Sequence, residues 1–91
     1  MTADLDLRRR RAAYRAAHRG TKEMDLLLGR YAEARLGSMD AEELGRFESL
    51  LIAPDPQLQN WILDAASVPE PRYAELIATL REFHGLTPSR Q

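Results

Sequence analysis

Residues 19–36 read RGTKEMDLLLGRYAEARL, and this stretch decides the fold. Its apolar residues recur at intervals of three, four and one, which is the spacing of one helix face, while most charged residues fall on the other side. Gly20 breaks the helix before it, and Thr21 is a good N-cap for the new helix. Gly37 is placed to end it as a left-handed C′ residue. The apolar face consists of Met24, Leu27, Leu28, Tyr31 and Leu36.

Helices are also expected on both sides of this stretch. The first should cover residues 3–18, and its expected inner side is Leu7, Ala13, Tyr14 and Ala17. After it and the helix beyond Gly20, a third helix starts where Asp40 and Glu43 have the form of a capping box, and Pro54 ends it. Its apolar stripe is Leu44, Phe47, Leu50 and Leu51.

Two further helices complete the chain. Asp55 is the expected N-cap of the fourth, with Pro56 at its first helical position. Residues 68–71 form a short stiff turn, and Gly85 closes the fifth helix. The apolar residues of these two helices are Leu58, Trp61, Ile62 and Ala65, then Tyr73, Leu76, Ile77, Leu80 and Phe83. The sequence therefore predicts an all-α fold, a compact five-helix bundle with short connections.

Composition limits the class of protein. The 91 residues fit a single helical domain over residues 1–91, with residues 3–85 ordered and a flexible N-terminal basic arm and C-terminal tail. Without cysteine, disulfides and thiolate metal sites are excluded, and two histidines do not favour a zinc site. No apolar run approaches the ~20 residues that cross a membrane, and the N-terminal residues do not show the apolar run expected of a secretory signal.

Charge is unevenly spread along the chain. Residues 1–35 carry nine Lys/Arg and five Asp/Glu, a net of +4, and residues 36–91 carry four and nine, a net of −5. The densest basic run is residues 8–11, four consecutive arginines. One interpretation is a solvated arm ahead of the first core helix; another is nucleic-acid binding, against which the acidic second half argues.

Nothing in the chain assembles into a catalytic set. Neither histidine has Asp and Ser partners at an informative spacing, and the five glycines are scattered rather than gathered in a phosphate loop. A bundle of this size has little room for a deep pocket. The residues alone favour a binding module, and a nucleic-acid-binding regulator or a toxin-neutralising interaction module remains an alternative at this point.

Two short motifs stand out in the chain. Residues 19–25, RGTKEMD, carry an R-G-x-x-E tract with an acidic residue two positions on, between the first two expected helices. Residues 55–61, DPQLQNW, have the pattern D-P-x-L-x-x-W. Together the two motifs resemble the signatures of the SdhE family of flavinylation, or succinate dehydrogenase assembly, factors. The resemblance covers about residues 8–84. His18 departs from the pattern, because the family frequently has Arg or Lys there.

The resemblance implies a five-helix protein that is not an enzyme. Its partner would be the flavoprotein subunit of succinate dehydrogenase, and in some bacteria fumarate reductase, whose covalent flavinylation with FAD it promotes. It implies no catalytic residue, no metal and no stably bound FAD, and neither nucleic acid nor membrane insertion. The expected state is a monomer in the bacterial cytoplasm, or in the mitochondrial matrix if the source is eukaryotic.

The resemblance also implies a partner-binding site at the bend between the first two helices. Gly20 would let the partner's backbone come close, and Arg19 would pair with a partner carboxylate. Glu23 would hydrogen-bond within the partner, or cap its own helix turn. The bend is expected to be exposed. The implied partner-binding residues are Tyr14, Arg15, Arg19, Gly20, Glu23 and Asp25.

Overall fold

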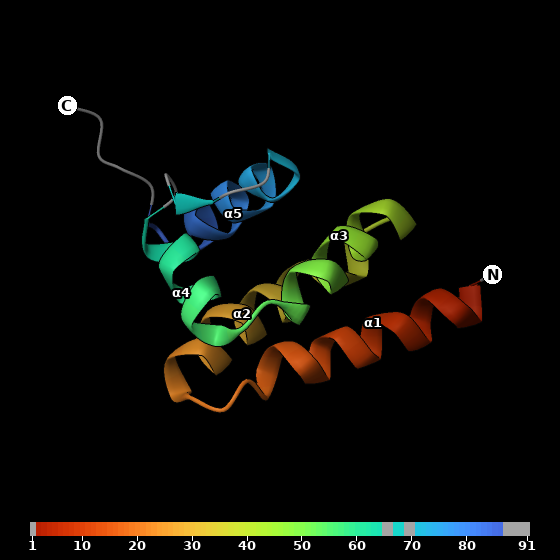
Figure 1. The fold of residues 1–91 in the computed structure, drawn as a ribbon. Helices are drawn as coiled ribbons and strands as arrows, with labels where there is room; N and C mark the ends of the chain where they lie inside the picture. Colours follow the sequence, from red (N-terminus) through yellow and green to blue (C-terminus); the bar gives the residue numbers. More distant parts are fainter. Residues whose placement is uncertain (1, 65–66, 69–70, 87–91) are drawn as a thin grey trace.

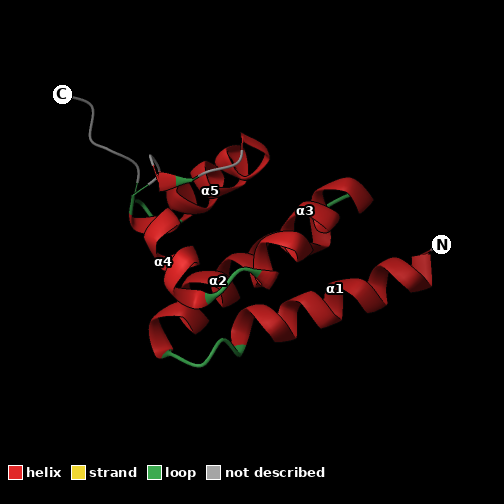
Figure 2. Ribbon diagram, in the orientation of Figure 1, coloured by secondary structure: helices red, strands yellow, loops and turns green. Residues whose placement is uncertain are grey.

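The computed structural model describes residues 2–64, 67–68 and 71–86, and in this part of the chain all regular structure is helical (Figure 1, Figure 2). The elements are α1 (Thr2–Ala17), α2 (Lys22–Arg35), the 3-10 turn η1 (Leu36–Ser38), α3 (Ala41–Ile52), α4 (Asp55–Leu63) and α5 (Pro71–Phe83). The connections between them are short. The predicted all-α bundle of five helices is therefore confirmed.

The five helices enclose a single core. α1 packs against α2 and α3, and α5 packs against α3 and α4, so α1 lies along one edge of the molecule (Figure 1). At the centre, Tyr31 of α2 meets Phe47 of α3 and Phe83 of α5, with ring centroids 5.9 Å and 5.5 Å away. Leu28, Phe47, Leu58, Ile62 and Ile77 are fully buried, so the predicted apolar faces of α2 to α5 point inward.

The inner side of α1 differs from the prediction. Ala12 and Ala16 are buried, whereas Leu7 and Tyr14 are exposed on the opposite face. The reason is the close approach of α2, because a Cβ added at Gly29 would lie 3.2 Å from the Cα of Ala17. Only small side chains fit between two helix backbones this close. Leu7 and Tyr14 are therefore turned outward, while Leu5, near the start of α1, packs against the core.

Helix starts follow the sequence more closely than helix ends. The Thr21 hydroxyl accepts from Met24 N at 3.3 Å, and both bonds of the Asp40–Glu43 capping box are present, which confirms those two caps. Gly37 does not have a positive φ, so its prediction as a left-handed C′ residue is wrong. α2 continues into η1 instead.

An arginine from α1 binds the backbone at this corner. Nε of Arg9 donates to the Leu36 carbonyl at 3.0 Å, and Nη2 donates to the Met39 carbonyl at 2.8 Å. These bonds attach α1 to the two ends of η1, which follows α2 directly.

Two more predictions at helix ends need correction. The N-cap of α4 is Pro54, whose carbonyl accepts the Leu58 N–H at 3.0 Å, so Asp55 is the first helical residue and its carboxylate pairs with Arg19. Leu86, expected to have little to bury, packs against the core, and its carbonyl accepts from Arg81. Gly85, with φ +71°, closes α5 as predicted. Ala65, residues 69–70 and residues 87–91 lie outside the described part of the chain.

Candidate functional site at the turn between α1 and α2

Residues 18–21 join α1 to α2 and are called the RG turn below. Gly20 is exposed and has φ +118°, a conformation that side-chain-bearing residues rarely adopt. A Cβ built at Gly20 would meet nothing within 4 Å. The glycine is therefore needed for the path of the backbone, and the space beside it is open to the outside.

The carboxylate of Asp25 holds the inside of the turn. Its Oδ1 accepts the backbone N–H of Arg19 and, at 3.3 Å, that of Gly20. Asp25 lies in the first turn of α2, where negative charge is also favoured by the helix dipole. Two backbone donors in an exposed turn are thus satisfied by the chain itself, which fixes the shape of the turn.

The guanidinium of Arg19 points into the bundle. Nε donates to Oδ1 of Asp55 at 2.8 Å, and the two terminal nitrogens donate to the carbonyls of Leu51 at 2.7 Å and Ala53 at 2.9 Å. Only 11% of the Arg19 side chain is exposed. In this arrangement Arg19 fastens the RG turn to the corner between α3 and α4, and its pairing with a partner carboxylate stays a prediction.

The remaining predicted site residues face solvent. Glu23 is exposed and accepts a hydrogen bond from Nε2 of Gln59 at 3.3 Å. Tyr14 is 65% exposed and stacks on His18 with 4.0 Å between ring centroids, and Arg15 is exposed beside it. The six predicted site residues therefore fall into two groups. Arg19 and Asp25 support the turn from inside, and the other four are exposed in the turn or on the helices beside it.

Sequence reasoning missed one apolar residue beside the turn. Ile52 is 79% exposed and lies between Leu51 and Ala53, whose carbonyls bind Arg19. A signal was present, because the buried stripe of α3 ends at Leu51 and an isoleucine in the last turn before Pro54 has no core position left. Ile52 thus places an exposed apolar side chain next to an otherwise polar turn.

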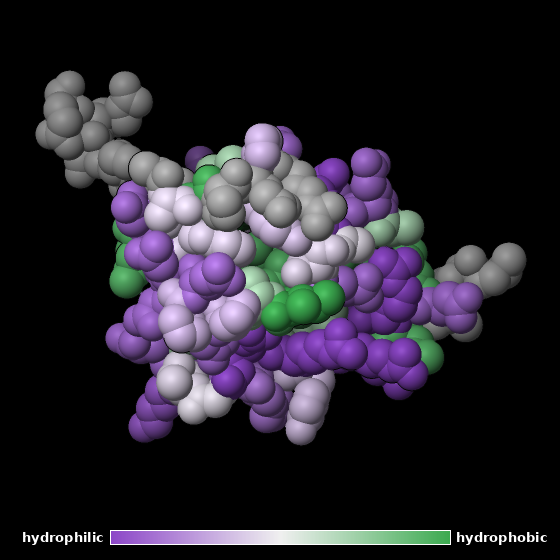
Figure 3. Space-filling model, viewed as in Figure 1, coloured by the Kyte–Doolittle hydropathy of each residue, from purple (hydrophilic) through white to green (hydrophobic). Residues whose placement is uncertain are grey.

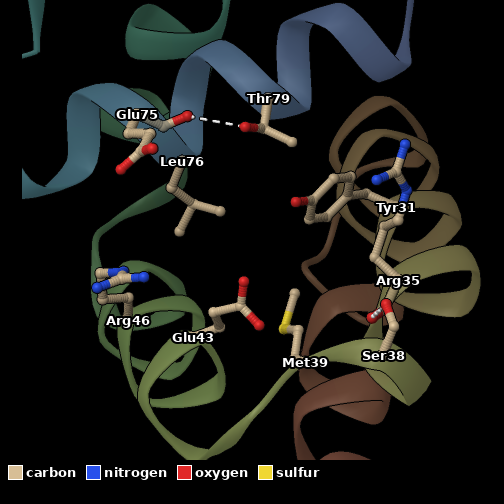
Figure 4. Close-up of a pocket in the computed structure, with 9 residues that line it drawn as sticks. All are labelled: Tyr31, Arg35, Ser38, Met39, Glu43, Arg46, Glu75, Leu76 and Thr79. Atoms are coloured by element: carbon tan, nitrogen blue, oxygen red, sulfur yellow. Dashed lines mark hydrogen bonds between the residues drawn. The ribbon is translucent and has the colours of Figure 1, made fainter.

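A cavity lies at the other end of α2. It has a volume of about 200 Å³ between α2, η1, α3 and α5 (Figure 4). Burial raises the pKa of Tyr31, whose hydroxyl points into it, with Arg35 acting in the opposite direction. Its lining residues are Tyr31, Arg35, Ser38, Met39, Glu43, Arg46, Glu75, Leu76 and Thr79.

The cavity is separate from the RG turn, and much of its polar lining already has partners. The Ser38 hydroxyl donates to the Arg35 carbonyl and the Thr79 hydroxyl to the Glu75 carbonyl, while Glu43 belongs to a capping box. Among the described residues there is no group of three or more His, Asp or Glu side chains that could hold a metal. None of the described helices combines the length and hydropathy that a membrane span requires.

The chain can now be compared with known proteins. A family described as "Flavinator of succinate dehydrogenase" matches residues 10–84. This small all-α bundle with a structured, exposed first turn therefore belongs to the SdhE family of succinate dehydrogenase assembly factors, as its two motifs predicted. No solved structure matches the chain significantly.

Individual relatives support the assignment. The chain is 40% identical over 79 residues to the FAD assembly factor SdhE of Acetobacter pasteurianus. The aligned residues cover 87% of this chain and 72% of the relative. It is 35% identical over 75 residues to the mitochondrial succinate dehydrogenase assembly factor 2 of Dictyostelium discoideum, covering 82% of this chain and 53% of the relative. For the Danio rerio protein of that name, the identity is 31% over 81 residues, covering 87% and 51%.

Proposed function

We propose that this chain is a non-enzymatic assembly factor that binds the flavoprotein subunit of succinate dehydrogenase and promotes its covalent flavinylation with FAD. The observation that carries the proposal is the RG turn, an exposed corner whose shape is fixed from inside by Asp25 and Arg19. Family membership supplies the class of partner.

In this proposal Gly20 and Glu23 form the contact. The open space beside Gly20 lets a backbone segment of the partner approach, and the exposed Glu23 carboxylate accepts hydrogen bonds from it. Arg15 and Tyr14 lie at the margin of this contact. Arg19 and Asp25 act as positioning residues, because their polar groups already bind within the chain.

Flavinylation would be promoted through orientation. A rigid binder that prefers one conformer of the flavoprotein raises the population of that conformer, and a population in which the flavin and its target side chain are well placed reacts faster. The bond-forming groups belong to the partner and its FAD, so this chain needs no cofactor of its own. The proposed active form is a monomer in the bacterial cytoplasm, or in the mitochondrial matrix for a eukaryotic source.

The test is a reconstitution with the purified apo flavoprotein subunit and FAD, in which covalent flavin is followed over time by in-gel fluorescence. Wild-type chain should accelerate the reaction, and Glu23→Ala should slow it about tenfold, since a charge-assisted contact is lost. Glu33→Ala is the matched control, because Glu33 is an exposed carboxylate on the same helix, farther from the RG turn.

Two results would contradict the proposal. Covalent flavin that forms equally fast without the chain would remove the function, and wild-type rates with Glu23→Ala would remove the assigned contact. Gly20→Arg would not separate the two explanations, because the new side chain would block the surface and would also be strained at φ +118°.

A further inference from the structure

The run of four arginines in α1 divides into two pairs with different surroundings. Arg8 and Arg9 point toward the bundle. Arg8 binds Glu48 of α3 through two bonds, Nη2 to Oε1 at 2.8 Å and Nε to Oε2 at 3.2 Å, and this carboxylate raises the pKa of Arg8. Arg9 binds the carbonyls of Leu36 and Met39. These two arginines fasten α1 to α3 and η1, so the run is not an arm ahead of the first helix.

The other pair points outward. Arg10 and Arg11 are exposed, as is Arg15 one turn on, and within the described part of the chain none of the three has an ion-pair partner. Spacings of three and four residues place them on one side of the helix together with Leu7 and Tyr14, both exposed. These five residues, Leu7, Arg10, Arg11, Tyr14 and Arg15, are called the outer face of α1.

The outer face continues into the RG turn. Tyr14 stacks on His18, the first residue of that turn, and the imidazole of His18 is hydrogen-bonded to the Tyr14 carbonyl at 2.8 Å. The distance from Leu7 to His18 along a helix is about 16 Å at 1.5 Å per residue. A partner that covers the RG turn can therefore extend over this face without a gap.

From Leu7 to Lys22 the charged residues are all of one sign. Residues 7–22 contain seven Lys/Arg and no Asp or Glu. Three of these cations, Arg8, Arg9 and Arg19, are bound within the chain, and the exposed ones are Arg10, Arg11, Arg15 and Lys22. In the view of Figure 3 the surface along α1 is mostly hydrophilic, with some intermediate and apolar atoms among the polar ones. The neighbouring exposed carboxylates are Asp4 and Asp6, which precede this stretch on α1, and Glu23 and Glu33 on α2.

We infer that the outer face of α1 docks on an acidic surface of the flavoprotein, beside the contact made by the RG turn; this rests on the proposed function. Arg10, Arg11 and Arg15 pair with carboxylates of the partner, while Leu7 and Tyr14 provide apolar area between the charges. Exposed charges of this kind mainly speed association, and a tyrosine among arginines is typical of strongly contributing interface positions.

Nucleic acid fits this surface less well. Two of the four arginines in the run are occupied inside the bundle, which leaves a single helix face rather than a basic surface over the whole domain. Residues 36–91 carry a net charge of −5, which would repel a polyanion that reached beyond α1. A folded partner with a local acidic patch meets neither obstacle.

The test measures association and dissociation rates of the full chain with the purified apo flavoprotein subunit at low and high salt. Arg10→Glu and Arg11→Glu should each slow association about tenfold at low salt, and the difference from wild type should shrink at high salt. Arg30→Glu is the matched control, an exposed arginine on α2 with the same change of charge. Tyr14→Ala should speed dissociation about tenfold, with little dependence on salt.

The outcomes separate this inference from the function on which it rests. Equal effects of Arg10→Glu and Arg30→Glu, or wild-type rates for Arg10→Glu and Arg11→Glu, would overturn the docking face while leaving flavinylation by wild-type chain intact. Tight, salt-sensitive binding to duplex DNA or RNA, with flavoprotein binding unchanged in Arg10→Glu, would assign the face to nucleic acid and also overturn it. Wild-type chain that does not bind the flavoprotein at all overturns both.

Discussion

α1 and α2 meet in two places, and a glycine of different character stands at each. At their crossing, Gly29 faces α1, and a Cβ there would lie 3.2 Å from the Cα of Ala17. At the RG turn, Gly20 has φ +118° and nothing within 4 Å of the position a Cβ would take. The first glycine leaves room for its own chain, and the second leaves room outside it.

The difference shows how an exposed turn can be as well determined as a packed crossing. The crossing is held by close contact of small residues, which have no polar groups to satisfy. The turn is held by hydrogen bonds, since Asp25 binds two of its N–H groups and Arg19 binds the corner between α3 and α4. A surface meant for another protein can thus be rigid without being buried.

Removing the hydrogen bonds of the turn should have the largest effect on stability. Arg19→Met leaves the carbonyls of Leu51 and Ala53 and the carboxylate of Asp55 without a partner, so the free energy of unfolding should fall by about 3 kcal/mol. Arg19→Lys should lie between wild type and Arg19→Met, since it keeps the charge but not the fork. Urea unfolding measures all three, and an unchanged midpoint for Arg19→Met would contradict the clamp.

A larger side chain between α1 and α2 should have the second largest effect on stability. Gly29→Leu places a side chain against the backbone of Ala17, and overpacking of this kind should lower the free energy of unfolding by about 2 kcal/mol. Ala34→Leu, at an exposed position of the same helix, should change it by less than about 0.5 kcal/mol. Thermal unfolding of the two variants measures this difference. Equal stabilities would mean that α1 and α2 can move apart without loss of stability.

A methyl group added at Gly20 should lower the free energy of unfolding by less than the two changes above. Gly20→Ala meets no atom, but it forces alanine into positive φ, so stability should fall by about 1–2 kcal/mol. Gly37→Ala is the control, since that position is equally open and its φ is not positive. If both variants unfold at the same denaturant concentration, backbone conformation is not what requires glycine at position 20.

Titration of the buried Tyr31 should have the smallest effect on stability. Burial raises the pKa of Tyr31, so the folded chain keeps this proton at a pH where the unfolded chain, near pKa ~10, loses it. Stability should therefore decline as the pH rises above about 10, and Tyr31→Phe should make this decline shallower. Urea midpoints across this pH range measure it, and identical slopes for wild type and Tyr31→Phe would refute it.

Most of the fold could be predicted from the sequence, because helix caps and apolar spacing are local signals. Thr21, the Asp40–Glu43 pair and Gly85 behaved as their local sequence indicates. α1 could not be oriented in this way. The fully buried residues of its inner side are the alanines Ala12 and Ala16, and a periodicity analysis gives more weight to the larger Leu7 and Tyr14. Near Ala17 the close approach of Gly29 leaves room only for small side chains.

The position of the candidate site could be predicted from the sequence. Which of its residues face solvent and which hold the turn from inside could not. The R-G-x-x-E tract points to the right turn, and Gly20 and Glu23 are indeed exposed. The inward direction of Arg19 has no local signature, because two of its acceptors are backbone carbonyls 32 and 34 residues farther along the chain. Any sequence can supply a carbonyl, so only the folded arrangement reveals that contact.

The attachment of Arg19 to Leu51, Ala53 and Asp55 limits how far this protein could be shortened. A peptide containing α1, the RG turn and α2 alone would include every residue of the recognition tract, yet it would lack the acceptors that hold the arginine. Such a hairpin would sample many shapes at its bend and lose affinity to the entropy of ordering it. A minimal mimic therefore has to carry the α3–α4 corner, or a staple that replaces it.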